Sequence, residues 1–228
     1  FNLGWLYQDD HKDLGNAEVW YIKSAELGNS GAMFNLGWLY QDDHKDLGNA
    51  EVWYIKSAEL GNSGAMFNLG WLYQDDHKDL GNAEAWYLKS AELGNSNAMN
   101  NLGALCQNEH KDLGKAEAWY KKSADLGNSV AMFSLGWLYQ YEYKDLGNAE
   151  AWYLKSAELG NSDAMFNLGW LYKKEYKDIE NAESWYKKSA ELGHSDAMNN
   201  LGVLCKNEHK DIENAESWYL KSAELGNS

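Results

Sequence analysis

Proline, arginine and threonine are absent from the 228 residues, and cysteine occurs only twice. Two cysteines do not make a disulfide framework, which excludes the class of small domains held together by several disulfides. No stretch approaches the roughly 18–20 consecutive apolar residues of a membrane-spanning helix, so we expect no membrane span. No basic segment followed by an apolar one opens the chain. Because the first residue is Phe1 and not Met, we take the chain to be a mature product or a fragment from which a targeting signal could be missing.

Positive charge is also scarce, since Lys and Arg together number 20 against 35 Asp and Glu, a formal net charge of −15. Such a charge repels polyphosphates over most of the surface and therefore argues against a nucleic-acid partner. The chain is 44% hydrophobic, which is enough for a substantial core. These numbers predict a soluble, acidic protein, for which we favour the cytoplasm over a secreted or periplasmic location.

The chain consists of one unit repeated seven times. Residues 1–33 recur without change as residues 34–66, and residues 67–99 differ from them at three positions only. Further copies begin at residues 100, 133, 166 and 199, and no linker or change of composition interrupts the series. A fixed period of this length is typical of solenoids, in which each unit packs only against its neighbours. We therefore predict a single repeat array over residues 1–228.

Two helices are predicted in each unit. In the second copy, Ser63 is placed as the N-cap of a helix through "GAMFNLGWLYQ", and Asp46 as the N-cap of a helix through "LGNAEVWYIKSAEL". Gly61 follows the latter helix, where a left-handed residue commonly ends a helix. The helical period places the core-facing residues of the first helix at Ala65, Leu69, Leu72 and Tyr73, and those of the second at Ala50, Trp53, Tyr54, Ser57 and Ala58.

Small residues on these faces, such as Gly37 and Ala50, allow the helices to approach closely, and the Trp and Tyr side chains fill the remaining space. The Trp–Tyr pair of the second helix, Trp20 and Tyr21 in the first copy, is predicted to lie in the core. A single helical hairpin cannot bury its own apolar face, so neighbouring hairpins must stack on it.

These residues resemble the Sel1-like repeat, a relative of the tetratricopeptide repeat whose pattern is A-x3-L-G-x2-Y, a loop, then D-x2-K-A-x2-W-Y-x-K-A-A-x2-G-x3-A. The resemblance covers all seven copies and implies an all-α, right-handed α/α superhelical solenoid of seven 33-residue helix-turn-helix repeats. The matching residues of one unit are Ala32, Leu36, Gly37, Tyr40, Asp46, Ala50, Trp53, Tyr54, Lys56, Ala58, Gly61 and Ala65.

The unit departs from the family pattern in the loop between its helices. Five residues separate Tyr40 from Asp46, where the family usually has eight, and the usual G-x-G-V loop is absent. The family's lysine before the alanine is Asn in this chain, except at Lys115. We expect the shorter loop to tighten each hairpin and to change the curvature of the array.

The loop itself carries an acidic cluster with a histidine, Asp9, Asp10 and His11 in the first copy, of the kind that metal and acid–base sites use. Only the Lys–Asp pair that ends this loop recurs in all seven copies, and that Asp is better explained as a helix cap. Equivalent loops of stacked hairpins should lie roughly 15–20 Å apart, too far for histidines to share one ion. We therefore interpret the cluster as a solvated turn, and predict no metal, no cofactor and no catalytic residue.

The two cysteines, Cys106 and Cys205, each replace an inward-facing Tyr of the repeat and lie three repeats apart. This separation excludes a disulfide between them. We predict two small buried thiols.

An aromatic stripe on the first helices is the best candidate for function. Its positions point roughly 180–240° away from the core-facing alanine of the same helix. In tetratricopeptide-like solenoids the first helix lines the concave surface, so the resemblance implies that these side chains face a groove. The alternative is that the Trp side chains merely pack between adjacent first helices. The predicted partner-binding residues, called the first-helix stripe below, are Phe34, Trp38, Gln41, Phe67, Trp71, Gln74, Asn100, Phe133, Trp137, Phe166 and Trp170.

Three classes of function follow. The leading hypothesis is a non-enzymatic adaptor whose concave face holds a peptide or protein segment, with basic residues on that partner favoured by the charge of this chain. The second is a structural solenoid that associates end to end into oligomers or filaments, because the copies are so similar that each end resembles an interior surface. An enzyme is disfavoured, since the chain shows no nucleophile–base pairing and no phosphate-binding loop.

Overall fold

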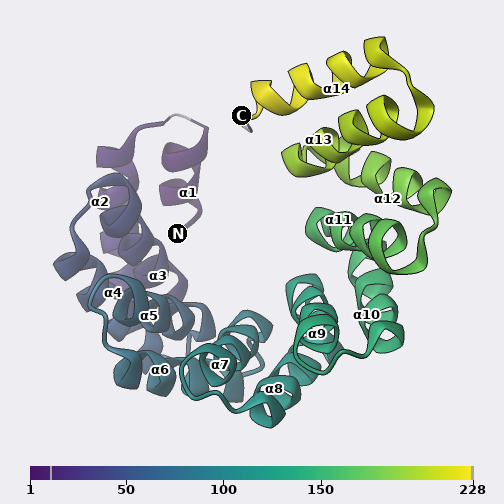
Figure 1. The fold of residues 1–228 in the computed structure, drawn as a ribbon. Helices are drawn as coiled ribbons and strands as arrows, with labels where there is room; N and C mark the ends of the chain where they lie inside the picture. The colour runs from purple at the N-terminus through teal and green to yellow at the C-terminus, as the bar shows by residue number, and fades with distance from the viewer. Residues whose placement is uncertain (11, 227–228) are drawn as a thin grey trace. The chain divides into compact units, whose positions relative to one another are not determined.

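The computed structural model describes residues 1–10 and 12–226, and within them the regular structure consists of helices joined by short turns, without a strand (Figure 1). The structure divides into two compact units, residues 1–119 and residues 120–228, and the boundary falls inside helix α8 (Leu113–Asp125). In both units helices follow one another as antiparallel hairpins, so the fold is the predicted all-α solenoid of helix-turn-helix repeats. None of the helices in the described part of the chain is long and apolar enough to cross a membrane.

In the first unit, each helix packs against the next along the chain, and the first helices of successive repeats also touch. Helices α3, α5 and α7 therefore form one layer and α4 and α6 the other. The helix α3 ends in a π-helical turn, η1. The elements are α1 (Asn2–Asp9), α2 (Leu14–Glu26), α3 (Ser30–Trp38), η1 (Leu39–Asp43), α4 (Leu47–Glu59), α5 (Ser63–Asp75), α6 (Leu80–Glu92) and α7 (Ser96–Asn108).

The second unit repeats this arrangement, with helix α9 against α10 and so on to α14, and with α9 also touching α11. The first helices of its last two repeats end in the π-helical turns η2 and η3. The elements are α9 (Ser129–Tyr141), α10 (Leu146–Glu158), α11 (Ser162–Leu171), η2 (Tyr172–Tyr176), α12 (Ile179–Glu191), α13 (Ser195–Leu204), η3 (Cys205–His209) and α14 (Ile212–Glu224).

Aspartate caps the second helix of each repeat, as predicted. The Oδ1 atom of Asp46 accepts a hydrogen bond from the backbone N–H of Asn49 at 3.0 Å, and this bond lowers the pKa of the Asp46 carboxyl. A carboxylate in this place satisfies one of the free N–H groups at the helix start. The same bond is made by Asp13, Asp79, Asp112, Asp145, Asp178 and Asp211.

The predicted cap of the first helix is wrong by one residue. Asn62, not Ser63, is the N-cap of α5, since its side chain accepts from the backbone N–H of Ala65 at 3.0 Å, and Ser63 is the first helical residue. Asn and Ser cap helices about equally well. The adjacent pair in "GNS" therefore left the choice open until the backbone of the turn was known.

A left-handed residue follows the C-cap of each helix of the unit. Gly61 has φ of 80°, as predicted, whereas the left-handed conformation of Lys45, with φ of 54°, was not expected from the sequence. Lysine is unusual here because a Cβ atom disfavours this region. It is held there because the N–H of Asp46, the next residue, donates to the carbonyl of Tyr40 at 2.8 Å and closes the loop. All seven loop lysines share this conformation.

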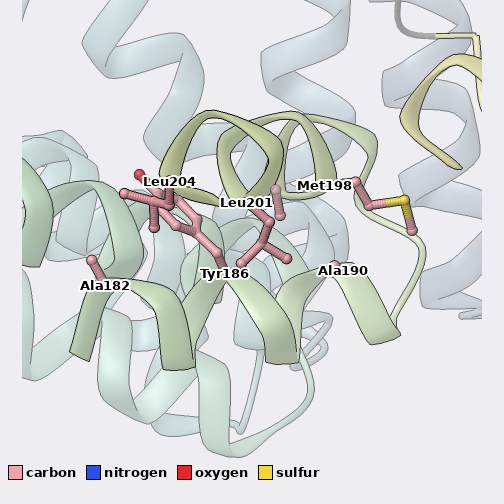
Figure 2. Close-up of a cluster of buried hydrophobic side chains, with 7 residues drawn as sticks. Ala182, Tyr186, Ala190, Met198, Leu201 and Leu204 are labelled. Carbon is pink, nitrogen blue, oxygen red and sulfur yellow. The ribbon is translucent and has the colours of Figure 1, made fainter. Parts of the chain in front are cut away.

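The core lies between hairpins, as the stacking argument requires. Figure 2 shows Ala182, Tyr186 and Ala190 along α12 facing Met198, Leu201 and Leu204 of α13, the first helix of the next repeat. These side chains are buried, and Trp218 from α14 packs against them. Equivalent clusters recur along the chain, and each joins the second helix of one repeat to the first helix of the next.

The Tyr and Trp of the second helix differ in burial, which corrects the prediction that both are core residues. Tyr21 and Tyr54 are fully buried, but Trp20 and Trp53 are only half-buried. Trp53 packs against the cluster formed by the preceding hairpin and α3, and the ammonium of Lys56 lies 4.2 Å from the centre of its ring. The indole therefore covers a junction between repeats with one face while a lysine shields the other.

Candidate functional site: the aromatic face of the first helices

Two of the four tryptophans are the exposed residues of the first-helix stripe. Trp38 on α3 and Trp71 on α5 are 41% and 40% exposed, although both follow a fully buried leucine by two residues in their helices. Trp137 on α9 and Trp170 on α11 are half-buried. The ring of Trp137 lies 5.0 Å from that of Tyr141, which in turn lies 6.4 Å from that of Trp170.

The phenylalanines of the stripe lie closer to the core. Phe34, Phe67, Phe133 and Phe166 are half-buried, and their ring centres lie 6.0, 5.8, 5.8 and 5.7 Å from the buried tyrosines of their own hairpins. A Cβ atom built on Gly64 would lie 3.5 Å from the ring of Phe34, so this ring reaches the start of the next first helix. The phenylalanines therefore pack between adjacent first helices, the place that the alternative interpretation gave to the tryptophans.

The glutamines of the stripe are hydrogen-bonded to the core. The hydroxyl of Tyr54 donates to Oε1 of Gln41 at 2.8 Å, and that of Tyr87 to Gln74 at 3.1 Å. The same bond joins Tyr153 to Gln140 at 2.8 Å, although Gln140 was not among the predicted stripe residues. These bonds were not expected from the sequence, although Tyr and Gln recur at a constant separation of 13 residues. Burial raises the pKa of Tyr54 to about 12, so its hydroxyl stays protonated and donates at ordinary pH.

Together these side chains leave a pocket between the second and third repeats, of about 330 Å³. We call it the Trp pocket. Two tryptophans and a phenylalanine form its walls, and one carboxylate stands at its edge. Four of its six residues belong to the predicted stripe, and the full set is Trp38, Gln41, Asp42, Phe67, Asn68 and Trp71.

A second pocket of about 310 Å³ adjoins the Trp pocket on the side of the interhelical loop and shares three of its residues. We call it loop pocket A. The ammonium of Lys45 lies 3.5 Å from Oδ1 of Asp42, and both side chains are largely exposed, so this ion pair contributes little stability. Loop pocket A is lined by Gln41, Asp42, Lys45, Leu47, Trp71 and Asp76.

The remaining stripe residue, Asn100, stands where the aromatic series is interrupted. Asn100 and Ala104 on α7 replace the Phe and Trp of the other repeats, and both are half-buried. A pocket with two tryptophan walls therefore cannot form at this junction.

The histidines of the acidic loops pair with carboxylates of the preceding repeat. Nε2 of His44, His77 and His110 lies 3.9, 3.6 and 3.4 Å from a glutamate of the preceding second helix, respectively Glu18, Glu51 and Glu84. The hydroxyl of Tyr40 also donates to Glu18. These contacts tie each loop to its neighbouring hairpin and were not expected from the sequence. His11, part of the acidic cluster of the first copy, lies outside the described residues.

A metal site and a reactive cysteine were also sought among the described residues. No group of three or more His, Cys, Asp and Glu side chains in residues 1–10 and 12–226 is arranged to hold a metal ion. Cys106 and Cys205 are free, buried thiols, as predicted, and burial raises the pKa of both. Burial and the nearby carboxylates therefore keep them in the unreactive thiol form.

Comparison with family models matches the Sel1 repeat seven times, over residues 1–29, 30–62, 63–95, 96–128, 129–161, 162–194 and 195–227. The match confirms the resemblance seen in the sequence and extends along nearly the whole chain. No curated protein sequence matches the chain.

Several solved structures share the fold. A Sel1 repeat protein from Oxalobacter formigenes is 27% identical, with a TM-score of 0.82 over 97% of this chain and 98% of that one. A protective antigen of uropathogenic Escherichia coli strains is 30% identical, with a TM-score of 0.72 over 98% of this chain; the match spans only 53% of the antigen, about half its length. An immunity protein from Pseudomonas aeruginosa is 25% identical, with a TM-score of 0.56 over 78% of this chain and 75% of that one.

Proposed function

The chain belongs to the Sel1 repeat family, and from that premise we propose that it is a non-enzymatic scaffold that binds a peptide or protein segment on the face formed by its first helices. Sel1 repeat proteins generally bind proteins, and the family is generally non-catalytic. A stack of hairpins offers such a partner an extended, repetitive surface.

The observation that carries the proposal is the Trp pocket. Most large apolar side chains of the first helices are buried, yet Trp38 and Trp71 expose about two fifths of their surface on either side of a hollow. Exposed neighbouring aromatics usually mark an interaction surface, and tryptophan is prominent among the residues that carry binding energy. The hydrogen-bonded Gln41 and the packed Phe67 hold the pocket walls in place before a partner arrives, which lowers the entropy lost on binding.

The charge of the chain favours a partner with basic residues. Asp42 stands at the edge of both pockets and Asp76 at the edge of loop pocket A, within a chain of net charge −15. Complementary charge at the rim of an interface mainly accelerates association and selects among partners. Binding should therefore weaken as the salt concentration rises.

Replacing Trp38 and Trp71 together by Ala should abolish most of the affinity for bound peptides. Peptides would first be selected with the wild-type protein from a displayed library of random sequences, and their Kd values then measured by calorimetry. We expect a loss of about tenfold or more, because burial of two indoles is removed from the interface. Since both side chains are already partly exposed, the far-ultraviolet circular dichroism should not change.

The matched control is Trp5→Ala. Trp5 occupies the same position of the first repeat, is 53% exposed, and is not among the residues that line the Trp pocket. The selected peptides should bind this variant as well as wild type. If the double variant keeps full affinity while its melting temperature falls, the tryptophans are packing residues and the proposal is wrong.

End-to-end association is a second candidate function, favoured by the exposure of two apolar surfaces. On α1, Leu3 is 44% exposed, whereas its counterpart Leu36 on α3 is fully buried against the preceding hairpin. On α14, Ile212 and Leu220 are exposed around a hollow of about 480 Å³. The α1 surface of one molecule carries the residues with which α3 covers α2, so it is suited to cover the α14 surface of another.

Sedimentation velocity over a concentration series tests this candidate on the 228-residue chain. Association would give a weight-average mass that rises with concentration, and Leu220→Glu should return it to the monomer value because a charge cannot be buried in that contact. The matched control is Val52→Glu, which places the same charge at another exposed apolar residue, on α4, that is not part of the α14 surface. A monomer at all concentrations contradicts end-to-end association.

A further inference from the structure

Loop pocket A recurs in the second unit. A pocket of about 340 Å³, here called loop pocket B, lies between the fifth and sixth repeats and is lined by the residues that stand three repeats further along the chain. The correspondence holds for all six lining residues, so the same hollow forms independently in two places. Loop pocket B is lined by Gln140, Tyr141, Lys144, Leu146, Trp170 and Glu175.

One position distinguishes the two pockets chemically. Gln, Lys, Leu and Trp are common to both, and Asp76 of pocket A is replaced by Glu175, which keeps the negative charge. Asp42 of pocket A, however, corresponds to Tyr141 of pocket B. This position follows the glutamine that is hydrogen-bonded to the core tyrosine, so its backbone is anchored equally in both units.

The substitution changes what each pocket can hold. Pocket A has two carboxylates and one ammonium around a single indole, and so carries a net negative charge. Pocket B has one carboxylate and one ammonium, and the ring of Tyr141 extends its indole wall toward Trp137, with ring centres at 6.4 and 5.0 Å. Pocket B is therefore electrically balanced and has a larger aromatic wall.

Each pocket matches a different class of side chain. A cation beside the indole and the carboxylates of pocket A gains from both, and this chain already places lysine ammonium groups 4.0–4.4 Å from indole centres in its second helices. An aromatic ring in pocket B gains a stacked or edge-to-face contact with two rings. The amide nitrogen of Gln140 also has no hydrogen-bond partner among the described residues, and a backbone carbonyl of a bound segment would supply one.

We infer that the residue after the anchored glutamine determines specificity: loop pocket A, with Asp42, takes a lysine or arginine side chain of the bound segment, and loop pocket B, with Tyr141, takes an aromatic one. This inference rests on the proposed function, because the bound segment is the partner of the scaffold. It assigns a chemical class of side chain to two defined places on the first-helix face.

The test uses capped single amino acids as probes, so that it needs no knowledge of the natural partner. The protein is labelled with 5-fluorotryptophan, and the fluorine resonances of Trp71 and Trp170 are assigned with the variants Trp71→Phe and Trp170→Phe. N-acetyl methylamides of lysine, norleucine and phenylalanine are then titrated while both resonances are followed. Norleucine is the uncharged control for lysine, with a similar apolar stem.

In wild type, lysine should bind pocket A about threefold more tightly than norleucine, as judged by the shift of the Trp71 resonance, and salt should remove the difference. Phenylalanine should bind pocket B about threefold more tightly than lysine, as judged by Trp170. Asp42→Tyr should transfer the aromatic preference to pocket A, and Tyr141→Asp should transfer the lysine preference to pocket B.

The matched control is Asp75→Tyr. Asp75 occupies the same position of the third repeat, but the next first helix has Ala104 where pocket A has Trp71. The new ring would lie one turn from Trp71, as Tyr141 does from Trp137, and so shift the Trp71 resonance itself, but pocket A should still prefer lysine and pocket B phenylalanine. The inference is overturned if lysine and norleucine bind pocket A equally, or if the two exchange variants do not alter the preferences. Failure of the proposed function would look different, since the library would then yield no peptide whose binding depends on Trp38 and Trp71.

Discussion

Replacing Gly70 by Ala should destabilise the protein by about 2 kcal/mol, typical of a core that is overfilled. A Cβ atom on this residue of α5 would lie 2.5 Å from two ring atoms of Tyr87, far inside van der Waals contact. Tyr87 is fully buried and its hydroxyl is hydrogen-bonded to Gln74, so the ring cannot move aside without breaking other contacts. The loss should appear as a lower urea midpoint of unfolding.

The matched control is Gly81→Ala, in the first turn of the next helix. The nearest atom to a Cβ at Gly81, an Oδ1 of Asp79, lies at 3.5 Å, so the methyl group fits. Both variants restrict the unfolded chain equally, and Ala is the better helix former. Gly81→Ala should therefore be neutral or stabilising by up to ~1 kcal/mol. Equal urea midpoints for the two variants would contradict the close packing of glycine and tyrosine.

The same contact explains why glycine stands at this position throughout the chain. A Cβ atom built on Gly4, Gly37, Gly136 or Gly169 would lie 2.4–2.6 Å from the nearest ring atom of the tyrosine in the same hairpin. The glycine of the L-G-x2-Y element is thus required because two helices touch there and leave no room for a Cβ atom. The fold does not depend on the backbone freedom of this glycine.

Alkaline pH should unfold the protein through its tyrosines. Burial raises the pKa of Tyr54 and Tyr87 to about 12, and hydrogen bonds to glutamates raise the pKa of Tyr40 and Tyr73 to about 12 as well. In the unfolded chain these hydroxyls ionise near pH 10. The folded state therefore binds more protons in this range, and its stability is complete below about pH 10 and is lost as the pH rises to about 12.

The size of the effect follows from the most buried groups. For Tyr54, a pKa of about 12 in the folded state against 10 in the unfolded state corresponds to about 2–3 kcal/mol of stability lost by the end of this range. Tyr87 adds a loss of the same order, so the two together remove a large part of the stability of an ordinary domain. We expect cooperative unfolding between about pH 10 and pH 12.

Tyrosinate absorbance and circular dichroism, recorded together during the titration, check this prediction. Ionisation of the core tyrosines and loss of helicity should occur in one transition. The variant Tyr54→Phe lacks one titrating hydroxyl, so its stability should fall less steeply with pH than that of wild type, whatever its stability at neutral pH. If most tyrosines ionise near pH 10 while the helices persist, the tyrosine hydroxyls are not protected and the prediction is wrong.

Much of the local structure was predictable because each helix signal lies within a few residues of the place where it acts. The aspartate caps, the left-handed Gly61 and the core positions Ala50 and Tyr54 agree with the structure. The errors occurred where two residues of similar chemistry compete locally, as with Asn62 and Ser63, or where exposure depends on a neighbouring repeat, as with Trp53.

The candidate site was predictable only in part. Helical periodicity placed Phe34, Trp38 and Gln41 on one side of their helix, but the structure treats them differently. Phe34 packs toward the next first helix, Gln41 is bonded to Tyr54, and Trp38 is left exposed. A period of 3.6 residues gives the direction of a side chain around one helix and says nothing about how far the neighbouring helix extends toward it.

By itself, the sequence determined the repeat unit, its two helices, the aspartate cap of the second helix and most of the residues that form the core, because these depend on periodicity and on hydrogen bonds between residues close in the chain. Only the tertiary structure decided which stripe residues are exposed, that the loop histidines pair with the preceding repeat, and that Trp71 meets Gln41 and Asp42 in one pocket. These features bring together residues from different repeats, and their distances depend on how one hairpin packs on the next.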